Sequence, residues 1–262
     1  MKTIINTVPK LAWELSRRSI LATLILSSRL SYFYITRYYC PAWGDFSITV
    51  YVTGKAQMFT LHSFLDVAGL AEAFVDKEYS FDGIDEVKTI LDIGGHIGDS
   101  TLYFRMKYPE ATITVVEPAT ETLQYLHKNF ANDDKVKIIQ GALAATSGYL
   151  ELQITKNSMG HSLKTRTSGI GQETVKTYTL ADICSLAGVS KFDITKFDIE
   201  GGEDALLSIK PDTYSRAYIG EIHLDLLPGV SLEDYKTVFK DASVTFTNTK
   251  HQKRYIMRAL YA

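Results

Sequence analysis

The sequence has few cysteines, little net charge and no long apolar run, and each absence excludes a class of protein. Its 262 residues include only two cysteines, Cys40 and Cys184, which occur in no CxxC or Cys/His spacing. This excludes a disulfide-stapled scaffold and a structural zinc site, and it favours a reducing, cytoplasmic setting. The formal net charge of −2 provides no general attraction to nucleic acid. We therefore expect a cytoplasmic globular protein with no nucleic-acid partner.

Signals for crossing or leaving a membrane are also missing. The apolar run ILATLILSS at 20–28 is about half the roughly 20 residues that a spanning helix needs. A bulky, basic stretch follows it in place of a small-residue cleavage site. Residues 1–44 nevertheless carry six basic side chains against one acid, Glu14. Peripheral contact between this basic, apolar segment and a membrane surface therefore stays open.

From residue 87 onward, β-type runs alternate with helix-type segments, which is typical of a parallel sheet. The runs are, in chain order, KTILDIG, ATITVVEP, VKIIQGAL, FDITKFDI and RAYIGEIHL. GYLELQI and TVKTYTL predict an inserted hairpin, and the last two runs, SVTFTN and YIMRALYA, predict an antiparallel hairpin at the sheet edge. The predicted fold class is α/β, with a Rossmann-like, doubly wound and mostly parallel sheet.

Three parts are predicted along the chain. They are an N-terminal helical extension at 1–44, a β-hairpin and helix leading into the core at 45–86, and the core domain at 87–262. Within them we expect one or two helices over 9–38, a hairpin over 46–61 with its turn at Gly54, and a helix over about 62–77.

The strongest chemical motif is LDIGGHIGDS, an acid at the end of a strand followed by a glycine turn that opens a helix. Its residues Asp92, Gly94, Gly95, His96 and Gly98 form D-x-G-x-x-x-G, whereas a nicotinamide cofactor favours G-x-G-x-x-G. An acid here would repel a pyrophosphate but would suit the cationic methionine end of S-adenosylmethionine. The alternative is a tight connection that binds nothing.

A second acid follows the next strand. Glu117, before Pro118, lies 19 residues past Gly98, where the diol of a nucleotide ribose needs a bidentate hydrogen-bond acceptor. Such an acid suits either nucleotide cofactor. The alternative is an acid at a helix N-terminus, which the helix dipole favours.

Further acids gather at the ends of two later strands. KFDIEGGE contains Asp198, Glu200 and Glu203, and EIH places Glu221 and His223 on one face of a strand. Methyl transfer to a hydroxyl needs a general base, and His223, Asp198, Glu200 and Glu221 are the candidates. The same four could instead hold a hard metal ion, and Glu200 and Glu203 could simply cap or solvate a helix.

These segments resemble the FkbM family of methyltransferases in order and spacing, over about residues 70–225. The resemblance rests on TILDIGGHIGDSTLYF, TVVEP, YTLADIC, ITKFDIEGGEDALLSIK and IGEIH, and its most specific element is K-x-D-x-E-G-x-E. It implies a class I methyltransferase fold, S-adenosylmethionine at Asp92, Gly94, Gly98 and Glu117, and O-methylation of sugars, glycolipids or secondary metabolites. The chain departs from the family at His96, where asparagine is frequent, at Gly202, where alanine is common, and in its N-terminal extension.

Three functions are therefore in competition. The first is an S-adenosylmethionine-dependent O-methyltransferase acting on a small-molecule or glycan hydroxyl. The second keeps the cofactor but methylates nitrogen or a carboxyl group. The third is a non-catalytic, methyltransferase-like module that associates with a partner or a membrane surface through the helices of residues 1–44.

Overall fold

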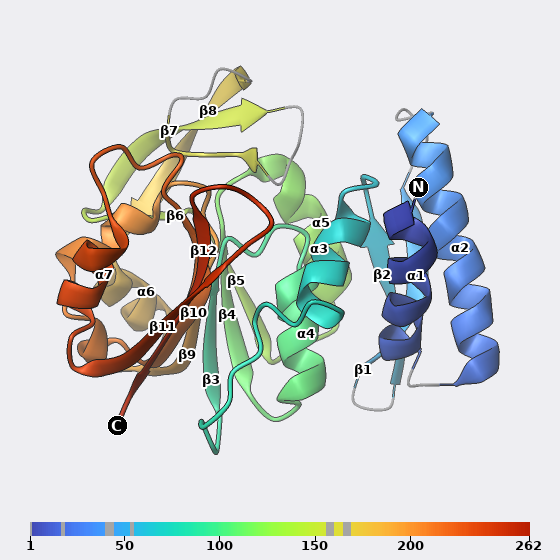
Figure 1. The fold of residues 1–262 in the computed structure, drawn as a ribbon, viewed down its shortest axis with the longest axis horizontal. Helices are drawn as coiled ribbons and strands as arrows, with labels where there is room; N and C mark the ends of the chain where they lie inside the picture. The colour runs from blue at the N-terminus through green and yellow to red at the C-terminus, as the bar shows by residue number, and fades with distance from the viewer. Residues whose placement is uncertain (1, 17–18, 40–44, 53–54, 156–159, 165–168) are drawn as a thin grey trace. The chain divides into compact units, whose positions relative to one another are not determined.

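The computed structural model describes residues 2–16, 19–39, 45–52, 55–155, 160–164 and 169–262 (Figure 1). The chain packs into two compact units. The first comprises Met1–Ser80, Ile97–Glu110 and Gln124–Asn132, and the second comprises Phe81–His96, Ala111–Leu123 and Asp133–Ala262. Each unit is built from more than one stretch of chain. The contiguous boundaries expected at 44 and 86 stay predictions.

The first unit begins with two helices, where the sequence predicts one or two over 9–38, and the first of them starts earlier than expected. Helices α1 (Lys2–Leu15) and α2 (Ile20–Tyr39) pack against each other, and both bury apolar side chains, Leu11 in α1 and Leu30 and Phe33 in α2. Strands β1 (Phe46–Val52) and β2 (Lys55–Leu61) form the expected antiparallel hairpin, whose turn at Gly54 lies outside the described residues. Among the described helices, none has both the length and the apolar content needed to cross a membrane.

The rest of the first unit is helical. It contains α3 (Asp66–Phe74), α4 (Asp99–Lys107) and the part of α5 (Thr120–Phe130) from Gln124 onward. Helix α3 is shorter than the 62–77 expected, because the Asp66 carboxylate accepts hydrogen bonds from the backbone N–H groups of His62 and Ser63. These bonds hold the residues before Asp66 in a turn.

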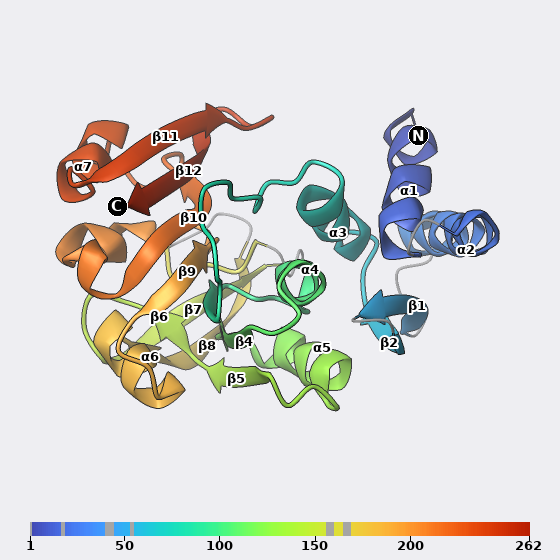
Figure 2. The same ribbon diagram turned by 90° about the horizontal axis from the view of Figure 1, so that it is seen from below.

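The second unit is built on a seven-stranded sheet with the order β11-β12-β10-β9-β3-β4-β5. Its strands are β3 (Thr89–Ile93), β4 (Thr112–Glu117), β5 (Val136–Gln140), β9 (Phe192–Phe197), β10 (Ser215–His223), β11 (Ala242–Asn248) and β12 (Arg254–Tyr261). The five strands from β10 to β5 are parallel, whereas β12 pairs antiparallel with both β10 and β11. Figure 2 shows this edge beside helix α7. The α/β class and the antiparallel edge hairpin are confirmed.

A small second sheet confirms the predicted inserted hairpin. Strands β7 (Gly148–Thr155) and β8 (Gly169–Tyr178) pair antiparallel, and β6 (Ala142–Leu143) adds to β8. Helix α6 (Leu180–Ala187) follows, and it begins at a capping box in which Thr179 and Asp182 satisfy each other's backbone N–H groups. Helix α7 (Leu232–Val238), which the sequence analysis did not predict, begins at a capping box of Ser231 and Asp234.

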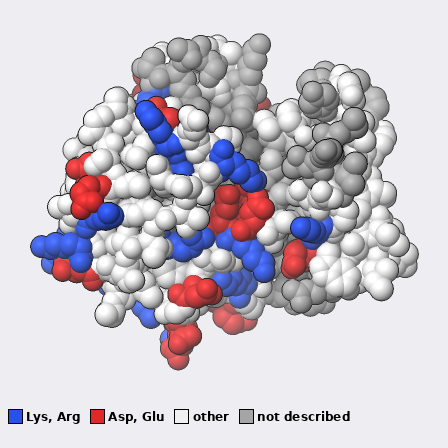
Figure 3. All heavy atoms as spheres, in the orientation of Figure 1, with Lys and Arg blue, Asp and Glu red and all other residues white. Residues whose placement is uncertain are grey.

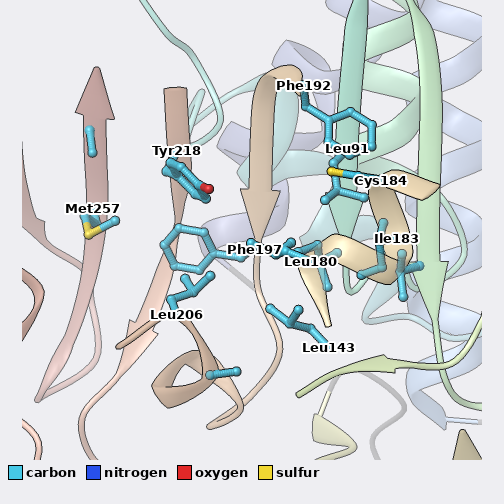
Figure 4. Packing of buried hydrophobic residues seen from close by; sticks show 14 of the residues in the cluster. Leu91, Leu143, Leu180, Ile183, Cys184, Phe192, Phe197, Leu206, Tyr218 and Met257 are labelled. Atoms are coloured by element: carbon cyan, nitrogen blue, oxygen red, sulfur yellow. The ribbon is translucent and has the colours of Figure 1, made fainter. Parts of the chain in front are cut away.

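One face of the main sheet carries the apolar core of the second unit (Figure 4). Leu91, Phe197, Tyr218 and Met257 are all buried there with residues of α6 and α7. Side chains alternate between the two faces of a strand, so Asp92, next to Leu91, belongs to the opposite face.

The order of the strands creates a switch point at the carboxyl ends of β3 and β9. The chain runs from β3 to β4 and β5 on one side, and later from β9 to β10 on the other. In doubly wound sheets, ligands bind outside the carboxyl ends of the strands at such a point. The glycine turn after β3 and the acids after β9 both lie there.

Candidate active site

The glycine turn folds back onto strand β4. The backbone N–H groups of Gly94 and Gly95 donate to the Val116 carbonyl at 2.9 and 3.3 Å, and the His96 N–H donates to Glu117 Oε2 at 2.9 Å. Because these donors are engaged within the protein, they do not form the open cradle of N–H groups that a pyrophosphate requires. The turn therefore matches the sequence-based argument against a dinucleotide cofactor.

Two residues of the turn need an unusual backbone conformation. Gly94 has φ +76°, and a Cβ atom there would lie 1.9 Å from the Asp198 carbonyl oxygen. His96 has φ +48°. Asparagine and histidine adopt this left-handed region more readily than most residues. The replacement of the family's frequent asparagine by His96 therefore preserves the backbone conformation.

Glu117 is almost fully engaged by the protein. Besides the His96 N–H, it accepts hydrogen bonds from the Ala119 N–H at 3.0 Å and from the Thr122 hydroxyl at 2.8 Å. A carboxylate offers about four lone-pair sites, so one remains for a ligand. Bidentate binding of a ribose diol by Glu117 therefore stays a prediction, and it would require one of these three hydrogen bonds to be released or shared. Pro118 follows, half-buried.

Asp92 forms a buried ion pair. Its Oδ1 lies 3.1 Å from Lys196 Nζ, and the two side chains are 0% and 2% exposed. Lys196 also donates to the Gly94 carbonyl at 2.7 Å, so the ion pair is hydrogen-bonded to the glycine turn. Sequence analysis gave Lys196 no role, because only the pairing of β3 with β9 places it opposite Asp92. Direct contact of Asp92 with a cofactor stays a prediction.

The four predicted catalytic residues meet at one point. His223 Nε2 lies 3.2 Å from a carboxylate oxygen of Glu221, 3.5 Å from one of Glu200 and 3.8 Å from one of Asp198. His223 itself is fully buried, and the three acids are partly buried. The ends of β9 and β10 therefore form a cluster of acids around one imidazole, which we call the His223 cluster.

Glu203 is a member of this cluster that the sequence analysis described only as a helix-capping or solvated acid. It is fully buried and accepts a hydrogen bond from His223 Nδ1 at 2.8 Å. It also accepts from the Gly201 N–H at 3.1 Å. The spacing K-x-D-x-E-G-x-E was the available signal, but only the fold turns Glu203 toward His223.

The charge state of His223 follows from these neighbours. Burial alone lowers the pKa of His223, but Glu203, Glu221 and Glu200 outweigh it and raise that pKa well above its usual 6.5. In the protein alone, the surrounding carboxylates therefore favour the protonated imidazole, which disfavours His223 as a proton acceptor. Among the candidates for a general base, the geometry favours the carboxylates, and the role predicted for His223 itself stays a prediction.

The cluster and the glycine turn are neighbours. The Asp198 N–H donates to the Ile93 carbonyl at 3.1 Å, so the first residue after β9 is fastened to the end of β3. On the face drawn in Figure 3, the described acidic and basic side chains are intermingled, and neither sign covers a large area.

Comparison with known proteins identifies the family. The model of the methyltransferase FkbM domain matches residues 92–226, more than half of the chain, from Asp92 to just past the His223 cluster. The chain belongs to the FkbM methyltransferase family. S-adenosylmethionine is the cofactor that this membership supports.

Two curated relatives match part of the chain. Methyltransferase 1 of Beauveria bassiana is 31% identical over 120 residues, which cover 45% of each chain. Methyltransferase sdnD of Sordaria araneosa is 35% identical over 94 residues, which cover 35% of this chain and 36% of that protein. The chain thus matches less than half the length of either relative.

Solved structures give weaker similarities. The Methanococcus jannaschii fibrillarin pre-rRNA processing protein has a TM-score of 0.49 and 9% identity, covering 85% of this chain and 91% of that one. Aeropyrum pernix fibrillarin, solved with natively bound S-adenosyl-L-methionine, has a TM-score of 0.46 and 11% identity, covering 82% of each chain. The strand order of the main sheet itself defines the α/β fold.

Proposed function

We propose that this FkbM protein is an S-adenosylmethionine-dependent methyltransferase that methylates a hydroxyl oxygen of a small molecule or glycan. One observation carries the proposal: the hydrogen bond from Asp198 N–H to the Ile93 carbonyl places the acids of the His223 cluster beside the glycine turn. A methyl donor at the turn and an acceptor at the acids would then lie close together, which is the main requirement of an in-line transfer.

The residues present suit this cofactor. S-adenosylmethionine has no phosphate, and the N–H groups of Gly94, Gly95 and His96 are not available to one. Glu117 retains one lone-pair site for a ribose hydroxyl. The partly buried acids Asp198 and Glu221 favour cationic groups nearby.

Proton transfer is the step that the chain itself would perform. When bound, S-adenosylmethionine supplies a methyl group on a positively charged sulfur. Asp198 or Glu221 would accept the proton of the acceptor hydroxyl, so that the hydroxyl oxygen could take up the methyl group that the cofactor supplies. Carboxylates in this role favour a hydroxyl acceptor, because a neutral amine attacks without prior loss of a proton.

The test has two stages. Calorimetric titration of the full chain with S-adenosylmethionine, in EDTA, is expected to give saturable binding. Glu117→Gln should weaken this binding roughly tenfold or more, since a buried acceptor is lost. Glu151→Gln, at an exposed position of strand β7, should bind as the wild type does.

Release of S-adenosylhomocysteine is then measured with hydroxyl, amine and carboxylate acceptors. Absence of cofactor binding by folded protein, or turnover of amines alone, would contradict the proposal.

A second candidate function rests on helix α2. Ile20, Leu21, Leu24 and Ile25 lie on one side of this helix and are 72%, 69%, 64% and 53% exposed. An apolar helix face of this kind favours association with a membrane surface. We propose it as an additional property of the chain. Co-sedimentation with phosphatidylserine vesicles should be lost in the Leu21→Ser and Leu24→Ser double variant and kept in Leu186→Ser, a change at an exposed leucine of α6.

A further inference from the structure

We propose that Asp198, Glu200 and His223 bind one divalent cation of the Mn²⁺ or Mg²⁺ class at the carboxyl ends of β9 and β10. One possible ligand atom from each residue lies within 4.8 Å of those of the other two. Hard divalent cations hold oxygen ligands at about 2.0–2.6 Å. Atoms on opposite sides of such an ion are therefore separated by about this span.

The Nε2 atom of His223 gives independent support. His223 is 0% exposed, and within the described part of the chain its Nε2 makes no hydrogen bond of acceptable geometry. Buried polar atoms are nearly always satisfied, so an exception calls for a specific explanation. Nε2 lies beside Asp198 and Glu200, where a cation would complete its contacts.

Glu203 holds the imidazole in the form that a metal requires. Glu203 accepts the hydrogen bond from His223 Nδ1 at 2.8 Å, so with a cation bound in place of the Nε2 proton the remaining proton would stay on Nδ1 and the Nε2 lone pair would face the cation. Metal-binding histidines typically donate their other N–H to a carboxylate in this way. Glu203 cannot itself be a fourth ligand, since it lies on the opposite side of the ring.

The charges of the His223 cluster also favour a bound cation. Asp198, Glu200, Glu203 and Glu221 surround His223, and the described basic side chain among them is Arg254, whose Nη1 lies 3.7 Å from Glu200 Oε1. A divalent cation would reduce the repulsion between these carboxylates. Two carboxylates with one imidazole suit Mn²⁺ well, because oxygen ligands favour Mg²⁺ and Mn²⁺ whereas imidazole favours the transition metals.

The cation site stands without the proposed function, but its use in catalysis rests on it. A bound cation could hold the acceptor's hydroxyl oxygen next to the glycine turn and make its proton more acidic. The proton would then pass to Glu221, which this site leaves as a nearby carboxylate.

Mn²⁺ binding by the full chain tests the site directly. Free Mn²⁺ gives a six-line electron paramagnetic resonance signal, so its loss on titration into metal-free protein counts the bound ions. The wild type should bind one equivalent saturably. Asp198→Asn and Glu200→Gln should each weaken binding by about tenfold or more. Asp204→Asn is the matched control, because Asp204 pairs with Lys164 outside the cluster, and it should bind as the wild type does.

The outcomes separate clearly. No saturable Mn²⁺ binding by folded wild type, or equal binding by the wild type and both ligand variants, would overturn the proposal. Circular dichroism verifies folding, and either ligand variant alone suffices if the other fails to fold. Because cofactor titrations contain EDTA and Mn²⁺ titrations contain no cofactor, each function can fail independently of the other.

Discussion

The second unit contains two buried charged clusters on neighbouring strands, and they differ in balance. At the end of β3, one acid, Asp92, faces one base, Lys196, and both are almost fully buried. At the ends of β9 and β10, several acids surround the single imidazole of His223. The first cluster is internally neutral, whereas the second carries an excess of negative charge.

This difference in charge balance distinguishes an ion pair that stabilises the fold from charged groups that bind ions or move protons. A neutral buried pair has no need of a ligand, and its removal should affect folding first. An unbalanced cluster is costly to bury and is typical of sites that bind ions or move protons. The predictions below test this contrast, beginning with the largest effect.

Breaking the Asp92 pair should cost the most stability. Lys196→Met removes the cation and leaves a buried carboxylate unpaired, which costs about 3–5 kcal/mol of the free energy of unfolding. Urea denaturation followed by circular dichroism measures this, with Lys240→Met at an exposed position as the matched control. A loss no greater than that of the control would mean that Asp92 is solvated or otherwise stabilised, and the contrast would fail.

The contact between the two clusters should come next. A methyl group at Gly94 would meet the Asp198 carbonyl and would force an alanine to adopt φ +76°, so Gly94→Ala should cost about 2–4 kcal/mol. Gly171 has nothing within 4 Å of a Cβ atom, and Gly171→Ala should change stability by less than about 1 kcal/mol. Thermal unfolding of both variants provides the measurement. Similar midpoints would show that the close approach of β3 and β9 is easily relaxed.

Glu203→Gln tests whether the second cluster acts through orientation of the imidazole. The amide can still accept from His223 Nδ1 but carries no charge, so Mn²⁺ affinity should fall about 10–100-fold, as for other residues behind a metal ligand. Glu203→Asp, which restores the charge, should recover part of it. If Glu203→Gln unfolds at the wild-type temperature and binds Mn²⁺ normally, Glu203 has no positioning role.

The fold was predictable from the sequence because strand and helix signals are local. The alternation after residue 87, the inserted hairpin and the antiparallel edge all follow from runs of apolar residues and turns, and they were found where expected. Helix α7 was missed because it is short and is defined mainly by its capping box, Ser231 and Asp234.

The proximity of the four predicted residues could be anticipated from the sequence, but their pairings could not, and their catalytic roles stay predictions. Asp198, Glu200, Glu221 and His223 were predicted because each stands at the end of a strand, and parallel strands bring their carboxyl ends together. The contacts of Lys196 with Asp92 and of Glu203 with His223 were not predicted, since they depend on which strands are neighbours and on the turn between β9 and the helical segment that follows. The hydrophobic periodicity of a sequence predicts individual helices and strands, but it does not predict contacts between side chains of different elements.

The smallest expected effect concerns Asp193, which lies near the amino end of β9 and forms an ion pair with Arg216. This ion pair is more exposed to solvent than the pair of Asp92 and Lys196. Burial raises the pKa of Asp193, but the N–H of Lys88, the guanidinium of Arg216 and the N–H of Thr89 outweigh it, so the pKa lies below its usual value. A depressed folded-state pKa contributes stability above the unfolded value, near 3.9, and that contribution disappears as the pH falls through the folded value.

Asp193→Asn should therefore lower the free energy of unfolding at neutral pH, with the Arg216 pair itself accounting for no more than about 1 kcal/mol because Arg216 is largely exposed. The difference between variant and wild type should shrink as the pH falls below about 4. Urea denaturation between neutral and acidic pH measures it. A difference that stays constant down to strongly acidic pH would mean that Asp193 contributes through its hydrogen-bonded geometry and not through its charge, which would place it with the neutral structural pair at Asp92.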